Sequence, residues 1–236
     1  MAQFLRNMIC KNNLGELLDN SFSYVICNDT GDKLEELFYR SIDENKDNFV
    51  VFKNELDIIR DILREDAQFF MDSDPAASSI DEIKMAYPGF KAIATYRISH
   101  VLYKLGYKVH ARYFSELAHS QTGIDIHPGA VIDYPFFIDH GTGIVIGETS
   151  SIGKRAKIYQ SVTLGAVSLS NAKELRGVVR HPQVGDDVTL YAGASLLGPI
   201  KIGNNVTIGS NVFLTEDVGD NIKVVIGKPE LIYKNK

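Results

Sequence analysis

Residues 184–214, VGDDVTLYAGASLLGPIKIGNNVTIGSNVFL, place an aliphatic side chain at every sixth position. These positions are Val184, Leu190, Leu196, Ile202, Ile208 and Leu214. A spacing of six that persists over this length is typical of a parallel β-helix, in which each hexapeptide forms one short strand and a turn. A single hexapeptide cannot bury its apolar face alone, so stacked coils of three hexapeptides share one core. The stretch therefore predicts a β-helix rather than a set of unrelated buried strands.

The same spacing extends upstream to residue 126, with one shift of two residues. The further aliphatic positions are Ile126, Ile132, Ile138, Ile144, Ile146, Ile152, Ile158 and Leu164. Leu164 and Val184 are twenty positions apart, which is not a multiple of six. Residues 166–183 are therefore predicted to leave the β-helix as a loop. A long loop on a rigid scaffold is often functional, although a surface insertion also costs little stability. The basic residues of this loop are Lys173, Arg176 and Arg180.

The first half of the chain lacks this spacing and is predicted to be helical. Within residues 55–71, aliphatic side chains recur three and four positions apart, which gives one apolar stripe on a helix. Ser73-Asp74-Pro75 ends that helix, because proline disfavours the helical conformation in the residue before it. Pro88 and Gly106 are expected to begin and end a second helix. The predicted fold is α+β, with an α-helical domain over residues 1–121 and a β-helix domain over residues 122–236.

The composition excludes several classes of protein. The chain has 236 residues, of which 44% are hydrophobic, so it can bury a sizeable core. A formal charge of −5 and a pI near 5.7 argue against a nucleic-acid-binding protein, which usually carries a basic face. Two cysteines, Cys10 and Cys27, form no disulfide framework. We recognise no signal peptide and no run of about 20 apolar residues that could span a bilayer, and we expect a cytoplasmic protein.

Two of the six histidines occupy positions that suit chemistry. His140 lies in the run Ile138-Asp-His-Gly-Thr-Gly143, and His181 follows Arg180 at the end of the predicted loop. A histidine with a near-neutral pKa can take a proton from an alcohol, and it needs a carboxylate or a carbonyl to fix its tautomer. Asp125 lies fifteen residues before His140, almost one eighteen-residue coil away, which makes such a pair possible. The remaining histidines are predicted to be surface or packing residues: His100, His110, His119 and His127.

Several motifs in one order give the chain a specific resemblance. The motifs are DPA (74–76), GF (89–90), YRISH (96–100), DIHPGA (125–130), IDHGTGIVIGET (138–149), YQSVTLG (159–165) and RHP (180–182). With these motifs, the chain resembles the serine acetyltransferases from residue 74 to the end of the repeats. A hexapeptide repeat alone would indicate only the broader acyltransferase superfamily, whereas the helical motifs and the Asp-His pair narrow the resemblance to the serine enzymes.

This resemblance implies both a fold and a reaction. The implied β-helix is left-handed, although parallel crossovers are usually right-handed. The implied enzyme transfers the acetyl group of acetyl-CoA, its co-substrate, to the hydroxyl of L-serine. The products are CoA and O-acetyl-L-serine, which is used for cysteine biosynthesis. No metal is expected.

The resemblance also assigns roles to individual residues. His140 is the expected general base, oriented by Asp125. Asp74 and Asp139 are expected to hold the serine ammonium. The residues expected to meet the serine carboxylate and the reacting centre are Arg180 and His181. The residues expected along the coenzyme arm are Ala166, Ala192 and Ser210.

The chemistry of these residue types agrees with such roles. Serine at neutral pH is a zwitterion, so its site needs an anion and a cation at a fixed separation. The planar fork of Arg180 can bind a carboxylate through two hydrogen bonds, and aspartates suit an ammonium. Glu148 resembles a family glutamate and is predicted to bond the backbone of its turn. The lysines that could meet the coenzyme phosphates, or could simply be surface charges, are Lys201, Lys223 and Lys228.

The resemblance further implies an assembly and a regulator. Family members form homotrimers on the coils, and the helical halves pair two trimers into a hexamer. L-cysteine is an expected inhibitor, because it differs from serine by one atom and a serine-shaped site can hardly exclude it. The loop at residues 166–180 is longer and more charged than the usual glycine-rich version. The isoleucine-ended tail that docks into O-acetylserine sulfhydrylase in many members is absent, which puts that complex in doubt.

Three other functions stay open at this point. An acetyltransferase that acts on a sugar or another hydroxyl would keep a base such as His140 but would not need a clamp for an amino acid. A trimeric, zinc-dependent protein like some carbonic anhydrases would need three histidines that converge from two chains. His127, His140 and His181 supply that number but not the spacing of that family. A non-catalytic scaffold would use the repeats for assembly alone.

Overall fold

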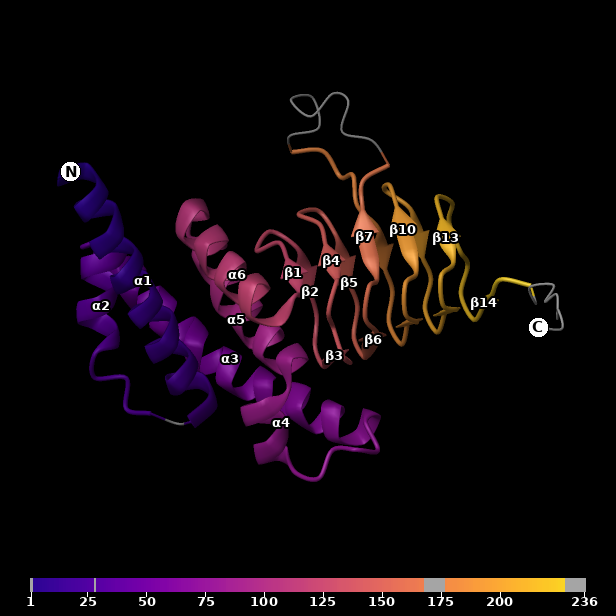
Figure 1. Cartoon of the computed structure of the whole chain (residues 1–236), viewed down its shortest axis with the longest axis horizontal. Coiled ribbons are helices and arrows are strands. Elements are labelled where there is room, and N and C mark those ends of the chain that lie inside the picture. Colours follow the sequence, from indigo (N-terminus) through magenta and orange to yellow (C-terminus); the bar gives the residue numbers. More distant parts are fainter. Residues whose placement is uncertain (1, 28, 168–176, 228–236) are drawn as a thin grey trace, which may run out of the picture.

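The computed structural model describes residues 2–27, 29–167 and 177–227, with side chains from residue 12 onward. In these residues, helices come first and short strands follow, as Figure 1 shows. The helices are α1 (Ala2–Cys27), α2 (Leu34–Ser41), α3 (Lys46–Ser73), α4 (Ile80–Ala86), α5 (Pro88–Lys104) and α6 (Lys108–Thr122). Lys173, Arg176 and Lys228 lie outside the described residues.

The helix ends follow from local sequence. Asn45 precedes α3, and its side chain accepts hydrogen bonds from the first free backbone N–H groups of the helix. Asp74 ends α3 in an extended conformation (φ −111°, ψ 107°), as expected for a residue before Pro75. Pro88 is the first residue of α5, as the sequence predicted, because proline suits the first turn. Gly123 ends α6 with a left-handed backbone (φ 72°).

The strands after residue 124 form a left-handed parallel β-helix of about five turns, which confirms the predicted fold. Successive coils pair in register, so that Ile126 lies beside Ile146 and Ile146 beside Leu164. The chain leaves the β-helix after Gly165 and re-enters at Gln183, in agreement with the predicted loop. The strands are β1 (Asp125–Ile126), β2 (Val131–Ile132), β3 (Phe136–Ile138), β4 (Val145–Ile146), β5 (Ser151–Ile152), β6 (Ala156–Ile158), β7 (Thr163–Gly165), β8 (Gln183–Val184), β9 (Thr189–Leu190), β10 (Ser195–Leu197), β11 (Lys201–Ile202), β12 (Thr207–Ile208), β13 (Phe213–Leu214) and β14 (Lys223–Val224).

Three sheets make the three sides of each coil. We name each sheet after its first strand. The β1 sheet has the order β1-β4-β7-β10-β13, the β2 sheet β11-β8-β5-β2, and the β3 sheet β14-β12-β9-β6-β3. The aliphatic residue of each hexapeptide points inward, and Ile158 and Ile208 are fully buried. Burying a side chain of this size stabilises a fold by about 1.5–3 kcal/mol. Because the spacing repeats this inward position in every hexapeptide, the buried side chains stack into one continuous core.

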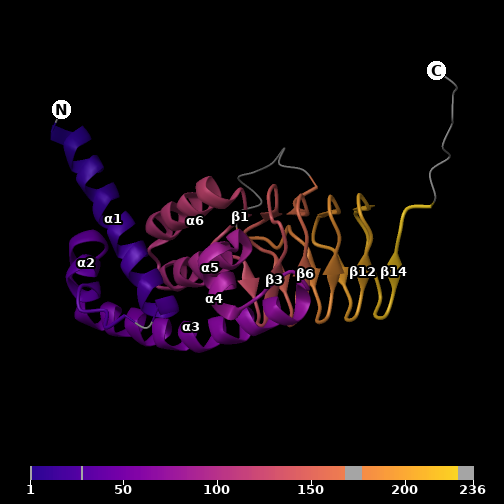
Figure 2. The ribbon, with the colours of Figure 1, turned by 60° about the horizontal axis from the view of Figure 1, so that its bottom comes forward.

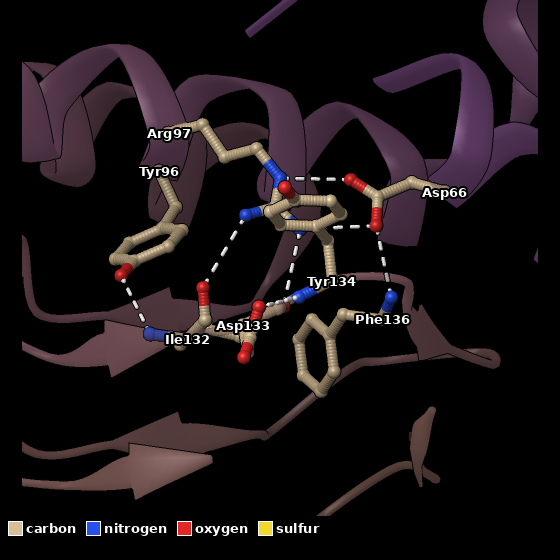
Figure 3. A network of polar contacts seen from close by, with 7 residues as sticks. All are labelled: Asp66, Tyr96, Arg97, Ile132, Asp133, Tyr134 and Phe136. Atoms are coloured by element: carbon tan, nitrogen blue, oxygen red, sulfur yellow. Dashed lines mark hydrogen bonds and ion pairs between the residues drawn. The ribbon is translucent and has the colours of Figure 1, made fainter. Parts of the chain in front are cut away.

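The helices cover the first coil and are bonded to it through buried polar groups. Both α3 and α5 contact β3, and Figure 2 shows them at the end of the β-helix where β3 lies. Arg97 of α5 donates to both carboxylate oxygens of Asp66 of α3, at 2.7 and 2.9 Å. Figure 3 shows these bonds. Asp66 also accepts the backbone N–H of Phe136 at 2.8 Å. Burial raises the pKa of the Asp66 carboxyl, and the charge of Arg97 opposes this rise.

This network ties the helical half to the β-helix. The hydroxyl of Tyr96 donates to the carbonyl oxygen of Ala130 and accepts the N–H of Ile132. α6 ends at Thr122 and β1 begins at Asp125. A division of the chain into independent domains between 121 and 122 stays a prediction. In the described part of the chain, no helix is long and apolar enough to cross a membrane.

Candidate active site

Two edges of the β1 sheet carry the candidate residues on the β-helix. The turns that precede its strands form the His140 edge, and they are 139–144, 159–162, 191–194 and 209–212. The turns that follow its strands form the Arg180 edge, and their described residues are 127–130, 147–150, 166–167, 177–182 and 198–200. The strand β4 joins the two edges, because His140 precedes it and Glu148 follows it. Within one chain, the predicted base and the predicted carboxylate-binding arginine therefore lie at opposite edges of one sheet.

The backbone at the His140 edge turns the imidazole outward. His140 has a left-handed conformation (φ 56°), which is uncommon for a residue with a side chain. Its N–H donates to Asp139 Oδ1 at 2.8 Å, and its Nδ1 lies 3.7 Å from the same oxygen. The next residue, Gly141, also has a positive φ (84°), and a Cβ there would lie 2.4 Å from Ile124 Cδ1. The His140 side chain is 68% exposed, which leaves it free to meet a substrate.

Asp74 reaches the same edge from the helical half. Its Oδ1 accepts the N–H of Ala76 at 2.8 Å, and its Oδ2 accepts the hydroxyl of Tyr87 at 2.7 Å. The hydrogen bond from Tyr87 and then that from Ala76 lower the pKa of Asp74, and His140 adds a smaller electrostatic contribution. Asp139 in turn contributes to the raised pKa of Tyr87. The structure thus brings Asp74, Asp139 and His140 into one electrostatic group.

A close backbone contact fixes the distance between the helical half and this edge. Gly89 in the first turn of α5 packs against the carbonyl of Ile138, and a Cβ on Gly89 would lie 2.2 Å from that oxygen. Only glycine permits this approach. Because Ile138 directly precedes Asp139, the contact holds the start of α5 beside the turn that carries His140.

Arg180 is held at the opposite edge by Glu148. The Nη2 of Arg180 lies 2.5 Å from Glu148 Oε2, and Glu148 Oε1 accepts the hydroxyl of Tyr103 at 2.9 Å. The Arg180 side chain is 19% exposed. The hydrogen bond from Arg180 is the largest cause that lowers the pKa of Glu148. Glu148 was expected to bond turn backbone, and the structure shows instead that it orients the arginine through side-chain bonds.

His181 is buried beside Arg180. Its Nδ1 accepts the N–H of Thr149 at 3.1 Å and lies 2.8 Å from the Thr149 hydroxyl. An Nδ1 that accepts an N–H carries no proton, so Nε2 is the protonated nitrogen of the neutral ring. Burial, and then the charge of Arg180, lower the pKa of His181 to about 4. A Cβ on Gly147 would lie 2.2 Å from the ring, so glycine is needed to admit it. His181 is therefore a neutral donor near pH 7.

Asp125 faces α6 rather than His140. Its Oδ1 lies 3.5 Å from Nη1 of Arg112, which also pairs with Glu116. Within the described residues of one chain, no contact joins Asp125 to His140, and their pairing stays a prediction. Glu116, His119 and Asp125 have ligand atoms within 4.8 Å of one another, but Arg112 neutralises both carboxylates.

The histidines proposed for a zinc site are divided between the edges. His127 and His181 lie at the Arg180 edge, and His140 lies at the other. The residues predicted along the coenzyme arm are divided in the same way. Ala192 and Ser210 stack at the His140 edge, where the N–H of Asn211 donates to the carbonyl of Ala192 at 2.9 Å. Ala166 lies at the Arg180 edge, directly after β7.

An aromatic pair at the His140 edge was not anticipated from the sequence. The rings of Tyr159 and Tyr191 stack with centroids 5.2 Å apart and planes 14° apart. β3 and β6 pair in register, so Tyr159 lies next to Asp139, and burial, followed by the charge of Asp139, raises the pKa of Tyr159. Both tyrosines directly follow strands of the β3 sheet, at the position that Asp139 occupies after β3. The loop between the two coils hides this equivalence in the sequence.

Comparison with known proteins first defines a class. A family described as bacterial transferase hexapeptide (six repeats) matches residues 181–216. These residues form the coils that follow the loop, with β8 to β13. The match identifies these left-handed coils as hexapeptide repeats of the kind found in bacterial transferases.

Relatives identify the family within this class. A plasmid serine acetyltransferase of Synechococcus elongatus is 52% identical over 170 residues, which are 71% of this chain and 53% of that protein. The serine acetyltransferase of Staphylococcus epidermidis is 43% identical over 174 residues, 74% of this chain and 78% of that protein. The alignment thus spans about half the length of the Synechococcus relative.

Solved structures extend the likeness to the helical half. Serine acetyltransferase isoform 3 of Entamoeba histolytica, in complex with cysteine, has a TM-score of 0.82 and 34% identity over 93% of this chain and 84% of that one. The enzyme of Neisseria gonorrhoeae in complex with serine has a TM-score of 0.71 and 32% identity, and covers 92% and 83%. A serine acetyltransferase in complex with CoA has a TM-score of 0.68 and 30% identity, and covers 91% and 93%. The chain belongs to the serine acetyltransferase family.

Proposed function

We propose that this chain transfers the acetyl group of acetyl-CoA to the hydroxyl of L-serine, giving O-acetyl-L-serine and CoA for cysteine biosynthesis. One observation carries the proposal: the carboxylate of Asp139 lies beside the exposed imidazole of His140, and Asp74 is close enough for its carboxylate to interact electrostatically with His140. Carboxylates bind an ammonium, and an imidazole can deprotonate a hydroxyl. A neutral sugar has no ammonium group, so an enzyme that acetylates such a sugar would not need both carboxylates here.

The second half of the substrate clamp lies at the Arg180 edge. The guanidinium of Arg180 supplies the positive charge that the serine carboxylate requires, and Glu148 orients it from behind. His181 is neutral and can donate from Nε2 to the carboxylate or to the oxygen that becomes negative in the reaction. We assign the ammonium to the His140 edge and the carboxylate to the Arg180 edge.

The reaction then needs one proton carrier. His140 takes the hydroxyl proton of serine while the oxygen attacks the carbonyl carbon of the thioester. A C–O bond forms, and the carbonyl electron pair moves onto oxygen to give a tetrahedral intermediate. Its collapse breaks the C–S bond, and the departing thiolate recovers the proton from His140. General base catalysis of this kind contributes about 10²–10⁴ in rate.

The separation of the two edges supports a trimer. We propose that the His140 edge of one copy meets the Arg180 edge of the next copy, because within one chain the two edges lie on opposite sides of the β1 sheet. Such a head-to-tail contact closes into a ring when the rotation is right. The outward positions of the β1 sheet, which lie between the edges, carry no basic side chain and include the exposed Val145 and Phe213. These outward positions are Asp125, Val145, Thr163, Ser195 and Phe213.

The same arrangement accommodates the coenzyme arm. Ala192 and Ser210 are small residues that follow each other up the His140 edge, so they leave room for a narrow chain. Ala166 lies at the other edge and borders the same cleft only when two copies meet. Asp125 of a neighbouring copy is the candidate to orient His140. We propose that the thioester is placed in this cleft.

Further properties follow from the family resemblance and remain proposals. They are inhibition by L-cysteine in the serine pocket, a hexamer built from two trimers through the helical halves, and a cytoplasmic location. A complex with O-acetylserine sulfhydrylase is not proposed. Residues 228–236, on which that argument depended, lie outside the described part of the chain.

The proposed activity is tested by thiol release from acetyl-CoA. Purified protein is incubated with acetyl-CoA and, one at a time, L-serine, other amino acids and hydroxyl-bearing sugars, and the free thiol is measured with a thiol-reactive dye. We expect release with L-serine and none with the sugars. Release with a sugar and none with serine would replace this proposal with the related sugar acetyltransferase. Mass analysis of the product as O-acetyl-L-serine completes the assignment.

A further inference from the structure

Tyr87 contacts the candidate site but has no assigned role. It is the single residue between α4 and α5. Its hydroxyl donates to Asp74 Oδ2 at 2.7 Å. Its ring packs edge-on against Phe70, which is fully buried, with centroids 6.1 Å apart and planes 79° apart. The phenol is therefore held at a fixed place beside the carboxylate that is proposed to bind the substrate ammonium.

The second carboxylate oxygen of Asp74 also has a fixed donor. Oδ1 accepts the N–H of Ala76 at 2.8 Å. A carboxylate offers about four lone-pair sites, so these two bonds leave about two free for an ammonium. The terminal torsion of an aspartate is broad, so the backbone bond alone would leave the second oxygen loosely oriented. The Tyr87 hydroxyl supplies the second fixed point.

The backbone that follows Tyr87 is tied to the turn that carries the base. Pro88 begins α5, and Gly89 lies so close to the carbonyl of Ile138 that only glycine fits there. Ile138 directly precedes Asp139. Tyr87 thus spans the gap between the end of α3, which carries Asp74, and the turn at Asp139. Tyr87 therefore links the position of the Asp74 carboxylate to that of the Asp139 carboxylate, so the fold sets the spacing between the two.

We propose that Tyr87 is a positioning residue, whose hydroxyl holds the Asp74 carboxylate in the orientation that binds the ammonium of the amino-acid substrate together with Asp139. This inference rests on the proposed role of Asp74. The hydrogen bond to Asp74, together with burial, raises the pKa of Tyr87 to about 12. The phenol therefore remains protonated, and remains a donor, throughout the neutral range.

The first test replaces the hydroxyl alone. Tyr87→Phe keeps the ring on Phe70 and removes only the donor. We expect the KM for L-serine to rise about tenfold, the usual effect of losing one hydrogen bond to a charged group, with little change in kcat. Tyr39→Phe is the matched control, because Tyr39 makes a similar bond to Glu35 at 2.8 Å on α2 and should leave the KM unchanged. The KM for acetyl-CoA is measured in parallel and should not change.

A double-mutant cycle separates positioning from a general structural role. In the background of Asp74→Asn, the added effect of Tyr87→Phe on serine KM should fall to about twofold or less, because the two residues act as a unit. If Tyr87 merely supported the fold, its tenfold effect would persist in that background. Thermal unfolding of each variant verifies whether it is folded.

Two results distinguish this inference from the proposed function. If Asp74→Asn weakens serine binding but Tyr87→Phe does not, the positioning role is wrong and the clamp survives. If Asp74→Asn itself leaves the serine KM unchanged, the proposed ammonium site is wrong, and the role of Tyr87 falls with it.

Discussion

The His140 edge and the Arg180 edge place two histidines in opposite surroundings on one scaffold. The His140 side chain is 68% exposed, beside the carboxylate of Asp139. His181 is 7% exposed and lies beside the cation Arg180, so its pKa falls to about 4. One histidine is placed to accept a proton and the other is kept neutral. Exposure to solvent and the neighbouring charges, rather than the residue type, therefore decide whether His140 or His181 can act as the base.

The carboxylates of the two edges differ in a parallel way. Neutral donors, first Tyr87 and then the N–H of Ala76, lower the pKa of Asp74. A cation, Arg180, is the first cause that lowers the pKa of Glu148. Asp74 therefore stays anionic mainly through neutral donors, and it can attract the ammonium of a substrate. Glu148 has its positive partner already, so it serves to orient that partner.

Removal of the exposed histidine should have the largest effect. His140→Ala is expected to lower kcat by about 10²–10⁴, the contribution of a general base. Because the side chain is exposed within the chain, the fold should persist, which thermal unfolding can verify, and light scattering checks that the assembly is unchanged. His110→Ala, in α6, is the matched control and should retain activity. Near-normal turnover in folded His140→Ala protein would remove the residue from the mechanism.

Replacement of the arginine fork should have the next largest effect. Arg180→Lys keeps the charge but loses the planar pair of donors, so the KM for L-serine should rise by about ten- to a hundredfold. Arg155→Lys makes the same exchange in an arginine that pairs with Asp187 at 2.6 Å, between the β2 and β3 sheets. That control should leave the KM unchanged. Equal serine KM values in wild type and Arg180→Lys would contradict the carboxylate site.

Replacement of the buried His181 should change how the free energy of unfolding depends on pH. Because the pKa of His181 in the folded state is about 4, below its ordinary value of 6.5, the unfolded chain binds more protons between these values. The contribution of His181 to the free energy of unfolding of the wild type is therefore fully present above pH 6.5 and is lost as the pH falls towards 4. His181→Gln lacks this loss, so its free energy of unfolding should fall less between pH 7 and pH 5. Parallel decreases in denaturant titrations of both proteins would show that His181 is protonated in the fold.

Replacement of Glu148, which orients Arg180, should have the smallest effect. Glu148→Gln should raise the KM for L-serine about threefold, because a partly exposed ion pair contributes about 0.2–1 kcal/mol to the arginine's orientation. The lowered pKa of Glu148 gives stability that is present above its ordinary value near 4.5 and is lost as the pH falls through the folded value. The difference in unfolding free energy between wild type and variant should therefore close below pH 4.5. A gap that stays constant at acid pH would contradict this account of Glu148.

Much of the fold that carries the His140 edge and the Arg180 edge could be predicted from the sequence. The spacing of six fixed the β-helix, because inward positions such as Ile158 must recur once per strand. The break between Leu164 and Val184 located the loop. The family resemblance supplied the left hand of the coils, which periodicity does not encode.

Other features depended on packing that no spacing reveals. Asp74 reaches His140 only because Gly89 lets α5 touch the carbonyl of Ile138. Arg180 and His140 lie at opposite edges of the β1 sheet because of the order of the strands around each coil. The roles implied by the resemblance assign both residues to one pocket and do not reveal this separation. The pairing of Asp125 with His140 also remains a prediction, since Asp125 faces Arg112 within the chain.

Complementation between two inactive variants tests the central claim that neighbouring copies share the site. His140→Ala and Arg180→Ala chains are unfolded together, mixed in equal amounts and refolded, and mass spectrometry verifies that mixed oligomers form. Where the His140 edge of an Arg180→Ala chain meets the Arg180 edge of a His140→Ala chain, an intact site results. In a randomly mixed ring about one quarter of the sites are intact, so thiol release with L-serine should recover to about one quarter of the wild-type value. If the mixed oligomers are no more active than the two variants refolded separately, each site is contained within one chain and the account is wrong.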